Sequence, residues 1–542
     1  MDEPVVHRPV VLIAEELSPA TVDALGPGVE VRHCAGADRA ALLAALPGAD
    51  AVLIRSATRM DAEALAAADR LRVIGRAGVG LDNVDVPAAS AAGVMVVNAP
   101  TSNVVSAAEL AVGLLVAVAR NIPQADAALK AGQWQRSRFS GVELAGKTLG
   151  LLGLGRIGTL VARRMRAFEM DVIAYDPYVQ PAHAAQEGVT LVPLEELLER
   201  SELISVHLPR TPETTGLLGF EALHRVRPGV RIVNAARGGI VDEAELYAAL
   251  KEGRVAAAGI DVFAVEPCPE SPLFELDSVV VTPHLGAGTA EAQERAGVSV
   301  AGSVRRALAG ALLPEAVNVR AGVIAPDLAP WLVLTERLAG LLVAATGRLP
   351  GRLEAVGRGE IAGHDVRVLE LGALKGALTG PVEGGVSYVN APALAAGRGL
   401  EAVATTGPDA LGYRSAVTLR AVFADGSEAS VTGTLTEPGG RALLVEIFGL
   451  PIDFPLGGEA VFFRCPDRTG VLGALGAALG AAGVNIAAMR LARTAPGEDA
   501  VVALSVDAPV RPEPLAEAAG DVRATRWWTL GDGGWEIRRT LV

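Results

Sequence analysis

Short apolar runs alternate with Ala-rich helical stretches along residues 10–98. Runs that are apolar throughout, rather than at every second position, are typical of parallel strands buried on both faces. The repeated strand–helix order predicts a doubly wound α/β layer. The predicted strands are Val10–Ala14, Ala51–Ile54, Val73–Gly75 and Val94–Val97.

A second series of the same kind begins near residue 149 and predicts a second α/β layer. After this series the pattern is helical from His284 to about Leu313, and the segment 314–318 closes the unit. The predicted strands of the second series are Leu149–Gly153, Val172–Tyr175, Leu203–Val206, Arg231–Asn234, Ala257–Ile260 and Val279–Thr282.

The last third of the chain changes in character. Residues 319–455 contain Gly-rich turns, a helix near Leu394 and β-type runs such as Ala416–Phe423 and Glu428–Leu435. From Glu459 the pattern predicts a βαββαβ order, which is typical of ferredoxin-like modules. Its elements are strand Ala460–Cys465, helix Gly470–Ala482, strands Asn485–Ala492 and Ala500–Val506, helix Pro512–Ala519 and strand Val522–Leu530.

Composition narrows the class of protein. The chain has 542 residues and a net charge of −14, so its surface repels nucleic acids and anionic membranes and neither is expected as a partner. Cys34, Cys268 and Cys465 form no CxxC pair, which favours a reducing compartment without disulfides or a metal site. The N-terminus lacks the features of a signal peptide, and the apolar run Leu110–Ala119 is too short to cross a bilayer. We therefore expect a cytoplasmic protein.

A glycine-rich loop, Gly153-Leu-Gly155-Arg-Ile-Gly158, follows a predicted strand and opens a predicted helix from Arg156 to Phe168. In such loops the first glycine allows a tight turn, the second lets a pyrophosphate approach the backbone, and the third allows close helix–strand packing. Asp176 ends the next strand, about 20 residues on, where a carboxylate can bind ribose hydroxyls. No arginine follows Asp176 directly, which favours NAD over NADP as the cofactor.

Three motifs downstream supply a cation, a carboxylate and an imidazole, in Asn234-Ala-Ala-Arg237-Gly-Gly, Asp261-Val-Phe-Ala-Val-Glu266-Pro and Thr282-Pro-His284-Leu-Gly-Ala. Oxidation of a hydroxy acid needs a base with a pKa near 7, and histidine suits that role. Glu266 can orient His284, and Arg237 can bind the substrate carboxylate and the developing carbonyl. We predict these residues to be catalytic.

At these motifs the chain resembles the D-isomer-specific 2-hydroxyacid dehydrogenases. The wider pattern resembles the phosphoglycerate dehydrogenases, whose long bacterial type carries an intervening domain and a C-terminal ACT domain. The resemblance implies NAD-dependent oxidation of 3-phospho-D-glycerate to 3-phosphooxypyruvate, the first step of L-serine synthesis. Further matching segments are Ile54–Thr58, Arg76–Asp85, Pro100–Asn103, Ser106–Glu109 and Gly141–Gly150.

The same resemblance implies sets of binding residues. The chain departs from some relatives at Val79, where they have Thr. Trp134, Arg136 and Arg138 lie in a segment that reaches the partner subunit in this family. The substrate set is Arg55, Ser56, Arg76, Gly78, Val79 and Asn103, and the NAD set adds Arg156, Ile157, Asp176, Ala235, Ala236, Arg237, Asp261, His284, Leu285, Gly286 and Ala287 to the glycines of the loop.

The resemblance also implies four domains and a homodimer or homotetramer. L-serine would bind between paired ACT domains, with Asp467 and Asn485 as effector residues; the alternative is a module that only dimerises. The expected domains are two Rossmann-like α/β domains, for substrate (1–98 and 288–318) and NAD (99–287), an α+β intervening domain (319–455) and a ferredoxin-like ACT domain (456–542).

Two other functions fit parts of the pattern. One is a different D-2-hydroxyacid dehydrogenase, a glyoxylate or hydroxypyruvate reductase, against which the C-terminal extension and Arg55-Ser56 argue. The other is an NAD-sensing corepressor or scaffold, which would need no intact set of Arg237, Glu266 and His284.

Overall fold

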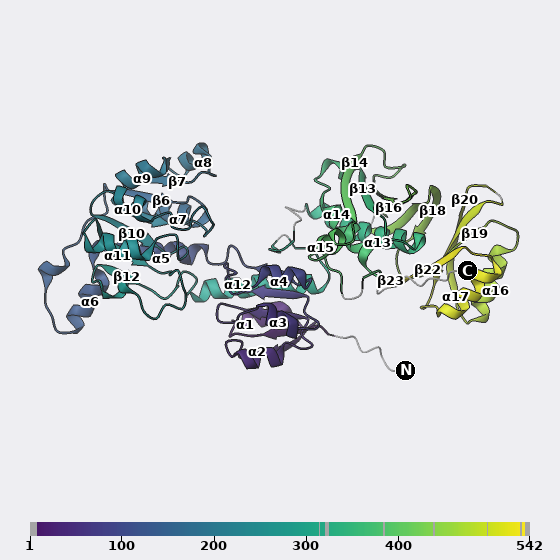
Figure 1. The fold of residues 1–542 in the computed structure, drawn as a ribbon, viewed down its shortest axis with the longest axis horizontal. Coiled ribbons are helices and arrows are strands. Elements are labelled where there is room, and N and C mark those ends of the chain that lie inside the picture. Colours follow the sequence, from purple (N-terminus) through teal and green to yellow (C-terminus); the bar gives the residue numbers. More distant parts are fainter. Residues whose placement is uncertain are drawn as a thin grey trace.

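The structure is a computed structural model that describes residues 8–313, 315–319, 325–382, 385–436, 440–495, 497–531 and 534–536. The chain forms an elongated molecule with one α/β unit at one end, another in the middle and two α+β units at the other end (Figure 1). The fold class predicted from the hydrophobic pattern is confirmed.

The middle unit is a five-stranded parallel sheet of order β2-β1-β3-β4-β5. Its central strands are buried, as their apolar sequences predict, whereas β2 is largely exposed and polar, which is why the pattern did not reveal it. The strands are β1 (Val10–Ile13), β2 (Glu30–His33), β3 (Ala51–Ile54), β4 (Val73–Arg76) and β5 (Met95–Asn98); the helices are α1 (Pro19–Leu25), α2 (Arg39–Ala45), α3 (Ala62–Ala67) and α4 (Val86–Ala91).

The end unit is a seven-stranded parallel sheet of order β12-β11-β10-β9-β6-β7-β8. All the strands predicted for it are present, and β8 is an additional short edge strand. The strands are β6 (Thr148–Leu152), β7 (Asp171–Tyr175), β8 (Thr190–Leu191), β9 (Leu203–Val206), β10 (Val230–Asn234), β11 (Val255–Ile260) and β12 (Val279–Val281); the helices are α5 (Val104–Arg120), α6 (Ile122–Lys130), η1 (Arg136–Phe139), α7 (Arg156–Arg166), α8 (Pro181–Gln186), α9 (Leu194–Arg200), α10 (Phe220–Arg225), α11 (Glu243–Lys251) and η2 (Pro272–Glu275).

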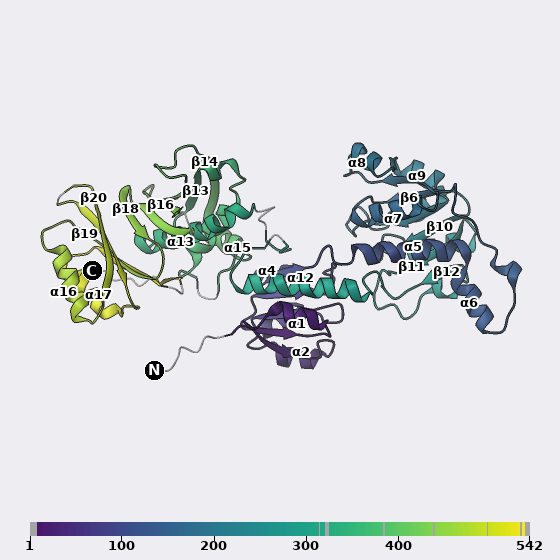
Figure 2. The ribbon, with the colours of Figure 1, turned by 180° about the vertical axis from the view of Figure 1, so that it is seen from behind.

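The chain crosses between these two units twice. It enters the second unit at α5, which packs against β10 and β11, and it returns through α12 (Ala290–Leu308), which packs on the first sheet (Figure 2). At the crossing the hydroxyls of Ser106 and Thr289 lie 2.8 Å apart, and Thr289 also caps α12 through the amide of Ala292. This contact therefore links the two segments that cross between the sheets, at the starts of α5 and α12.

The third unit is a six-stranded mixed sheet of order β14-β13-β15-β16-β17-β18, in which only the β13–β14 pair is parallel. By length and composition α13, and α5 with α6 taken as one bent pair, could cross a membrane, but 67% of the apolar window of α13 is buried, as in a core helix. The elements are η3 (Pro326–Leu328), α13 (Ala329–Thr346), β13 (Arg352–Gly359), η4 (Glu360–Gly363), α14 (Val368–Leu378), α15 (Ala391–Ala396), β14 (Glu401–Gly407), β15 (Ser415–Val422), β16 (Glu428–Thr436), β17 (Arg441–Ile447) and β18 (Leu450–Pro455).

The fourth unit has the predicted βαββαβ order in an antiparallel sheet, β20-β21-β19-β22-β23. Trp527 and Trp528 in β22 are buried on opposite sides: Trp527 within this unit, and Trp528 in a core shared with α13, where it stacks on Phe462. The third and fourth units thus share one hydrophobic core. The elements are β19 (Glu459–Pro466), α16 (Val471–Ala481), β20 (Ile486–Arg493), β21 (Asp499–Val506), α17 (Pro512–Asp521), β22 (Arg526–Gly531) and β23 (Gly534–Glu536).

A turn before α15 joins the third unit to the first. The Ser387 hydroxyl donates to the carbonyl of Gly93 at 2.8 Å, and Val389 is buried in the core of the first sheet. Gly93 has φ of 75°, and a Cβ there would overlap Nδ2 of the Asn390 side chain in its present position. The segment 387–390 therefore forms part of the interface between the first and third units.

Candidate active site

A cavity of about 750 Å³ lies between the first and second units. The loops after β3 and β4 line it from one side, and the loops after β10, β11 and β12 line it from the other. Because the carboxyl ends of parallel strands meet at one edge of a sheet, both sheets present their functional loops there. The predicted residues that line the cavity are Arg55, Ser56, Arg76, Val79, Asn103, Arg237, Glu266, His284, Leu285 and Ala287.

His284 and Glu266 form a hydrogen-bonded pair in this cavity. Nδ1 of the imidazole lies 2.5 Å from Oε2 of the carboxylate, and Oε1 accepts a hydrogen bond from the amide of Phe263 at 2.9 Å. His284 has a left-handed backbone, with φ of 54°. The bond to Glu266 occupies Nδ1, so Nε2 is the nitrogen left to exchange a proton with a substrate.

Asp261 lies behind this pair and is fully buried. Oδ1 accepts from the Thr282 hydroxyl at 2.6 Å and from the Leu285 amide at 2.7 Å, and Oδ2 accepts from the Gly286 amide at 3.1 Å. Burial raises the pKa of Asp261, against the lowering effect of these bonds. Its side chain holds the loop that carries His284; direct contact with NAD stays a prediction.

The Arg237 loop is fixed by its own motif. Asn234 donates from Nδ2 to the carbonyl of Arg237 at 3.0 Å and accepts from the amide of Ala236 at 3.1 Å. A Cβ at Gly238 would overlap the carbonyl of Phe263, so only glycine lets this loop pack against the Glu266 loop. The close approach brings the guanidinium and the imidazole into one cavity.

The glycine-rich loop has the geometry that its spacing predicts. Gly153 has φ of 97°, and a Cβ at Gly158 would overlap the carbonyl of Gly153, whereas a Cβ at Gly155 would meet no protein atom within 4 Å. Asp176 at the end of β7 accepts from the amide of Leu154 at 2.9 Å. The loop, the start of α7 and the carboxylate therefore fit a dinucleotide pyrophosphate and ribose.

His207, which the sequence analysis did not select, lies beneath this loop. Its Nε2 is 2.9 Å from the Ser205 hydroxyl, and burial lowers its pKa to about 4. The imidazole is thus neutral near pH 7. Its position after the strand β9 is the signal in the sequence that points to it.

The first unit contributes two cations to the cavity: Arg55 follows β3, and Arg76 is the last residue of β4. Burial lowers the pKa of Arg76, and the charge of Arg237 lowers it further. The Nε atom of Arg76 has no hydrogen-bond partner among the described residues. A Cβ at Gly78 would overlap the guanidinium of Arg76, so Gly78 gives room to this side chain. Asn103 precedes α5 without a side-chain capping bond, and the residue lines the cavity.

The backbone amides around Arg55 bind a carboxylate of the protein. The amides of Arg55, Ala57 and Thr58 donate to Glu15. These three amides are therefore not free for a substrate, because Glu15 follows β1, the strand that pairs with β3. Arg55 itself lines the cavity.

The predicted effector residues have partners within the chain. Asp467 accepts from Arg493 at 2.6 Å, and Asn485 donates to Asp507 at 2.5 Å. Among the described residues, no group of His, Cys, Asp and Glu is placed to hold a metal ion.

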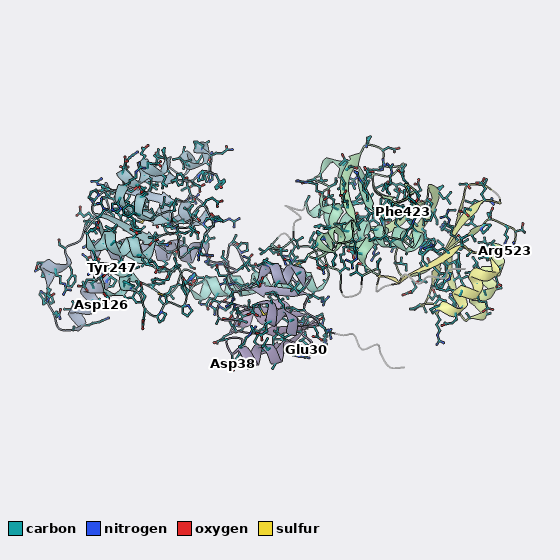
Figure 3. All side chains as sticks on the ribbon, viewed as in Figure 1. Glu30, Asp38, Asp126, Tyr247, Phe423 and Arg523 are labelled. Carbon is teal, nitrogen blue, oxygen red and sulfur yellow. The ribbon has the colours of Figure 1, made fainter. Side chains whose placement is uncertain are left out.

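A protruding segment carries the residues expected to reach a partner subunit. Helix α6 has no buried residue, and Asp126 on it lies at the outer edge of the second unit (Figure 3). Trp134 is 77% exposed, and Arg138 pairs with Asp277 at 2.5 Å.

Family models match the chain in three successive parts. The model of the NAD binding domain of D-isomer specific 2-hydroxyacid dehydrogenases matches residues 112–286, which defines the class of the site. The D-3-phosphoglycerate dehydrogenase intervening domain matches residues 327–448, and the ACT domain matches residues 460–519. NAD as the cofactor is confirmed.

Relatives of known name are similar over nearly the whole chain. The D-3-phosphoglycerate dehydrogenase of Mycobacterium leprae is 55% identical over 95% of this chain and 96% of the relative, and that of Methanocaldococcus jannaschii is 38% identical over 94% and 97%. The chain belongs to the D-3-phosphoglycerate dehydrogenase family.

Solved structures resemble the first two units. A crystal structure of a Thermus thermophilus protein has 35% identity and a TM-score of 0.53, covering 57% of this chain and 99% of that one. A glyoxylate reductase from Paecilomyes thermophila has 30% identity and a TM-score of 0.51, covering 55% and 95%.

Proposed function

We propose that this protein oxidises 3-phospho-D-glycerate to 3-phosphooxypyruvate with NAD, the first step of L-serine synthesis. One observation carries the proposal: the His284–Glu266 pair shares a cavity with Arg237 and with the cations Arg55 and Arg76 of the facing unit. Relatives that match 92% or more of the chain are named D-3-phosphoglycerate dehydrogenase.

In this reaction His284 takes the proton of the substrate hydroxyl at Nε2. Glu266 holds the ring through Nδ1 and stabilises the imidazolium that forms, as the carboxylate does in other acid–base pairs. Arg237 binds the carboxylate and the developing carbonyl oxygen as a planar cation. Bound NAD supplies the hydride acceptor.

Substrate recognition divides between the two units. Arg237 lies with the catalytic loops, so the phosphate of the substrate would extend toward Arg55, Ser56 and Arg76. Gly78, Val79 and Asn103 would complete this end. A glyoxylate or hydroxypyruvate reductase would have no phosphate for these cations to bind, and a corepressor would need no ordered acid–base pair.

NAD would bind along the carboxyl edge of the second sheet. Gly153, Gly155, Arg156, Ile157 and Gly158 would bind the pyrophosphate, and Asp176 would accept the ribose hydroxyls. The remaining contacts would come from the loops after β10, β11 and β12, at Ala235, Ala236, Arg237, Asp261, His284, Leu285, Gly286 and Ala287.

Serine feedback through the ACT domain belongs to the proposal. Asp467 would bind the ammonium of serine, and in the free protein Arg493 occupies that carboxylate. The effector must therefore compete with a guanidinium for Asp467. Asn485, which donates to Asp507, would turn to the serine between paired domains.

We propose a cytoplasmic homodimer or homotetramer. The exposed Trp134 and the unburied helix α6 support a second copy as the partner of this segment. We further propose the domain boundaries 1–98 with 288–318, 99–287, 319–455 and 456–542, which agree with the crossings at α5 and α12 and with the end of β18.

NADH formation on a panel of D-2-hydroxy acids, with and without serine, tests the proposal. Turnover should be highest on 3-phospho-D-glycerate and should fall with serine. Faster turnover on unphosphorylated hydroxy acids would favour the reductase alternative, and no NADH on any acid would favour the scaffold.

A further inference from the structure

The carboxylate of Glu15 lies behind the loop that carries Arg55. Oε1 accepts from the amides of Arg55 at 2.8 Å and Thr58 at 2.9 Å, and Oε2 accepts from the amide of Ala57 at 3.2 Å. Glu15 follows β1, the neighbour of β3, so the bonds join residues 40 and more positions apart in the sequence. One side chain thus binds most of the donors of the loop.

Asn83 binds the carbonyl groups of the same loop. Its Nδ2 donates to the carbonyl of Arg55 at 2.6 Å and to the carbonyl of Thr58 at 2.5 Å. Glu15 and Asn83 therefore hold both ends of the loop, one through amides and the other through carbonyls. A surface loop without such bonds would lose conformational freedom when a ligand ordered it, and that loss would weaken binding.

Only part of the loop is left for a ligand. Arg55, Ser56 and Ala57 line the cavity, and the amide of Ser56 donates to no group in the described part of the chain. The guanidinium of Arg55 with the amide and hydroxyl of Ser56 is a donor set that suits a phosphate.

We propose that Glu15 and Asn83 are positioning residues that determine the selectivity for a phosphorylated substrate. They keep the Arg55–Thr58 loop ordered before the substrate binds, so that Arg55 and Ser56 meet the phosphate without a cost in ordering. The inference rests on the proposed function, in which Arg55 binds the phosphate.

Because Glu15 is negatively charged, a charge effect and a positioning effect would change substrate affinity in opposite directions. A carboxylate near a phosphate site repels the ligand, so its removal would strengthen binding if charge alone mattered. If Glu15 orders the loop, its removal must weaken binding instead, because the amides of Arg55, Ala57 and Thr58 lose their acceptor.

The experiment compares kcat/KM on 3-phospho-D-glycerate and on D-glycerate for the full-length protein. Glu15→Ala and Asn83→Ala should each lower kcat/KM on the phosphorylated acid by roughly 10-fold, the effect of losing hydrogen bonds to a charged or buried group. The loss on D-glycerate should be much smaller. Glu15→Gln should fall between, because an amide keeps one acceptor but turns a donor toward another donor.

Three comparisons separate the outcomes. Glu16→Ala removes a neighbouring exposed carboxylate and should match the wild type. In an Arg55→Ala background, Glu15→Ala should add a clearly smaller loss on the phosphorylated acid than in the wild type, since only the contacts of Ser56 then remain to be positioned. Additive losses, equal losses on both substrates, or tighter binding of the phosphorylated acid by Glu15→Ala would overturn the inference. If Arg55→Ala lowers kcat/KM equally on 3-phospho-D-glycerate and on D-glycerate, the result would instead refute the phosphate-binding role of Arg55 in the proposed function.

Discussion

Nδ1 of His284 and Oε2 of Glu266 lie 2.5 Å apart, although the residues belong to different loops after β11 and β12. Strands β11 and β12 are parallel neighbours in the sheet, so the loops that follow them lie side by side. The cis peptide bond between Glu266 and Pro267 lies in the same loop. An imidazole paired in this way has one nitrogen fixed and one free, which is the arrangement that a general base requires.

We expect His284→Asn to lower turnover by roughly 10²–10⁴-fold, the usual effect of losing a general acid–base. Asparagine tolerates the left-handed backbone of this position, with φ of 54°, so the loop should keep its shape. Steady-state rates and the NAD dissociation constant test this, and NAD binding should be unchanged. Near-normal turnover would rule out His284 as the base.

Asp176→Ala should weaken NAD binding and narrow the preference for NAD over NADP. The carboxylate can accept the ribose hydroxyls and repel a 2′-phosphate. The same side chain accepts from Leu154 in the glycine loop, so its loss also loosens that loop. KM values for both cofactors give the test; an unchanged ratio would mean that another group sets the choice.

Arg55→Ala should raise KM for the phosphorylated acid far more than for an unphosphorylated analogue. A charge-assisted hydrogen bond contributes roughly 1.5–3 kcal/mol, or about 10- to 150-fold in KM. Arg59→Ala is a suitable control, since Arg59 follows the same loop and its side chain is 79% exposed. Equal losses on both substrates would show that Arg55 does not bind the phosphate.

Gly238→Ala should abolish most activity, because the new Cβ would overlap the carbonyl of Phe263 and force the Arg237 and Glu266 loops apart. Gly302→Ala is the matched control: it lies in α12, and its Cβ would meet no atom within 4 Å. The control should keep its activity and its melting temperature. Comparable activity of the two variants would show that the loops can separate without consequence.

Serine should bind between paired ACT domains and inhibit, and Asp467→Ala or Asn485→Ala should abolish inhibition without loss of basal turnover. An effector distant from the cavity acts only through a two-state element that it biases, here the crossing of α5 and α12. Calorimetry with serine is the direct measurement. Arg493→Ala should tighten serine binding by freeing Asp467. If the wild type shows neither heat nor inhibition at millimolar serine, the module serves only dimerisation.

Local pattern was enough to predict the buried strands of both parallel sheets and the loops at their ends, but not the exposed edge strands β2 and β8. A buried parallel strand is apolar at every position, and functional loops follow its carboxyl end, so both features are visible within a few residues. The βαββαβ order was predictable for the same reason. Helices α13 and α14 were not predicted, because they are buried on nearly all sides and show no contrast between two faces.

The sequence by itself determined which residues could perform the chemistry: His284, Glu266, Arg237 and the glycine loop. Only the tertiary structure decided which groups hold them in place. Glu15 and Asn83 reach the Arg55 loop across 40 and 28 residues, and Asp261 fixes the His284 loop across more than 20. Such bonds depend on the order of strands in a sheet and on the close approach at Gly238, and neither leaves a periodic signal in the chain.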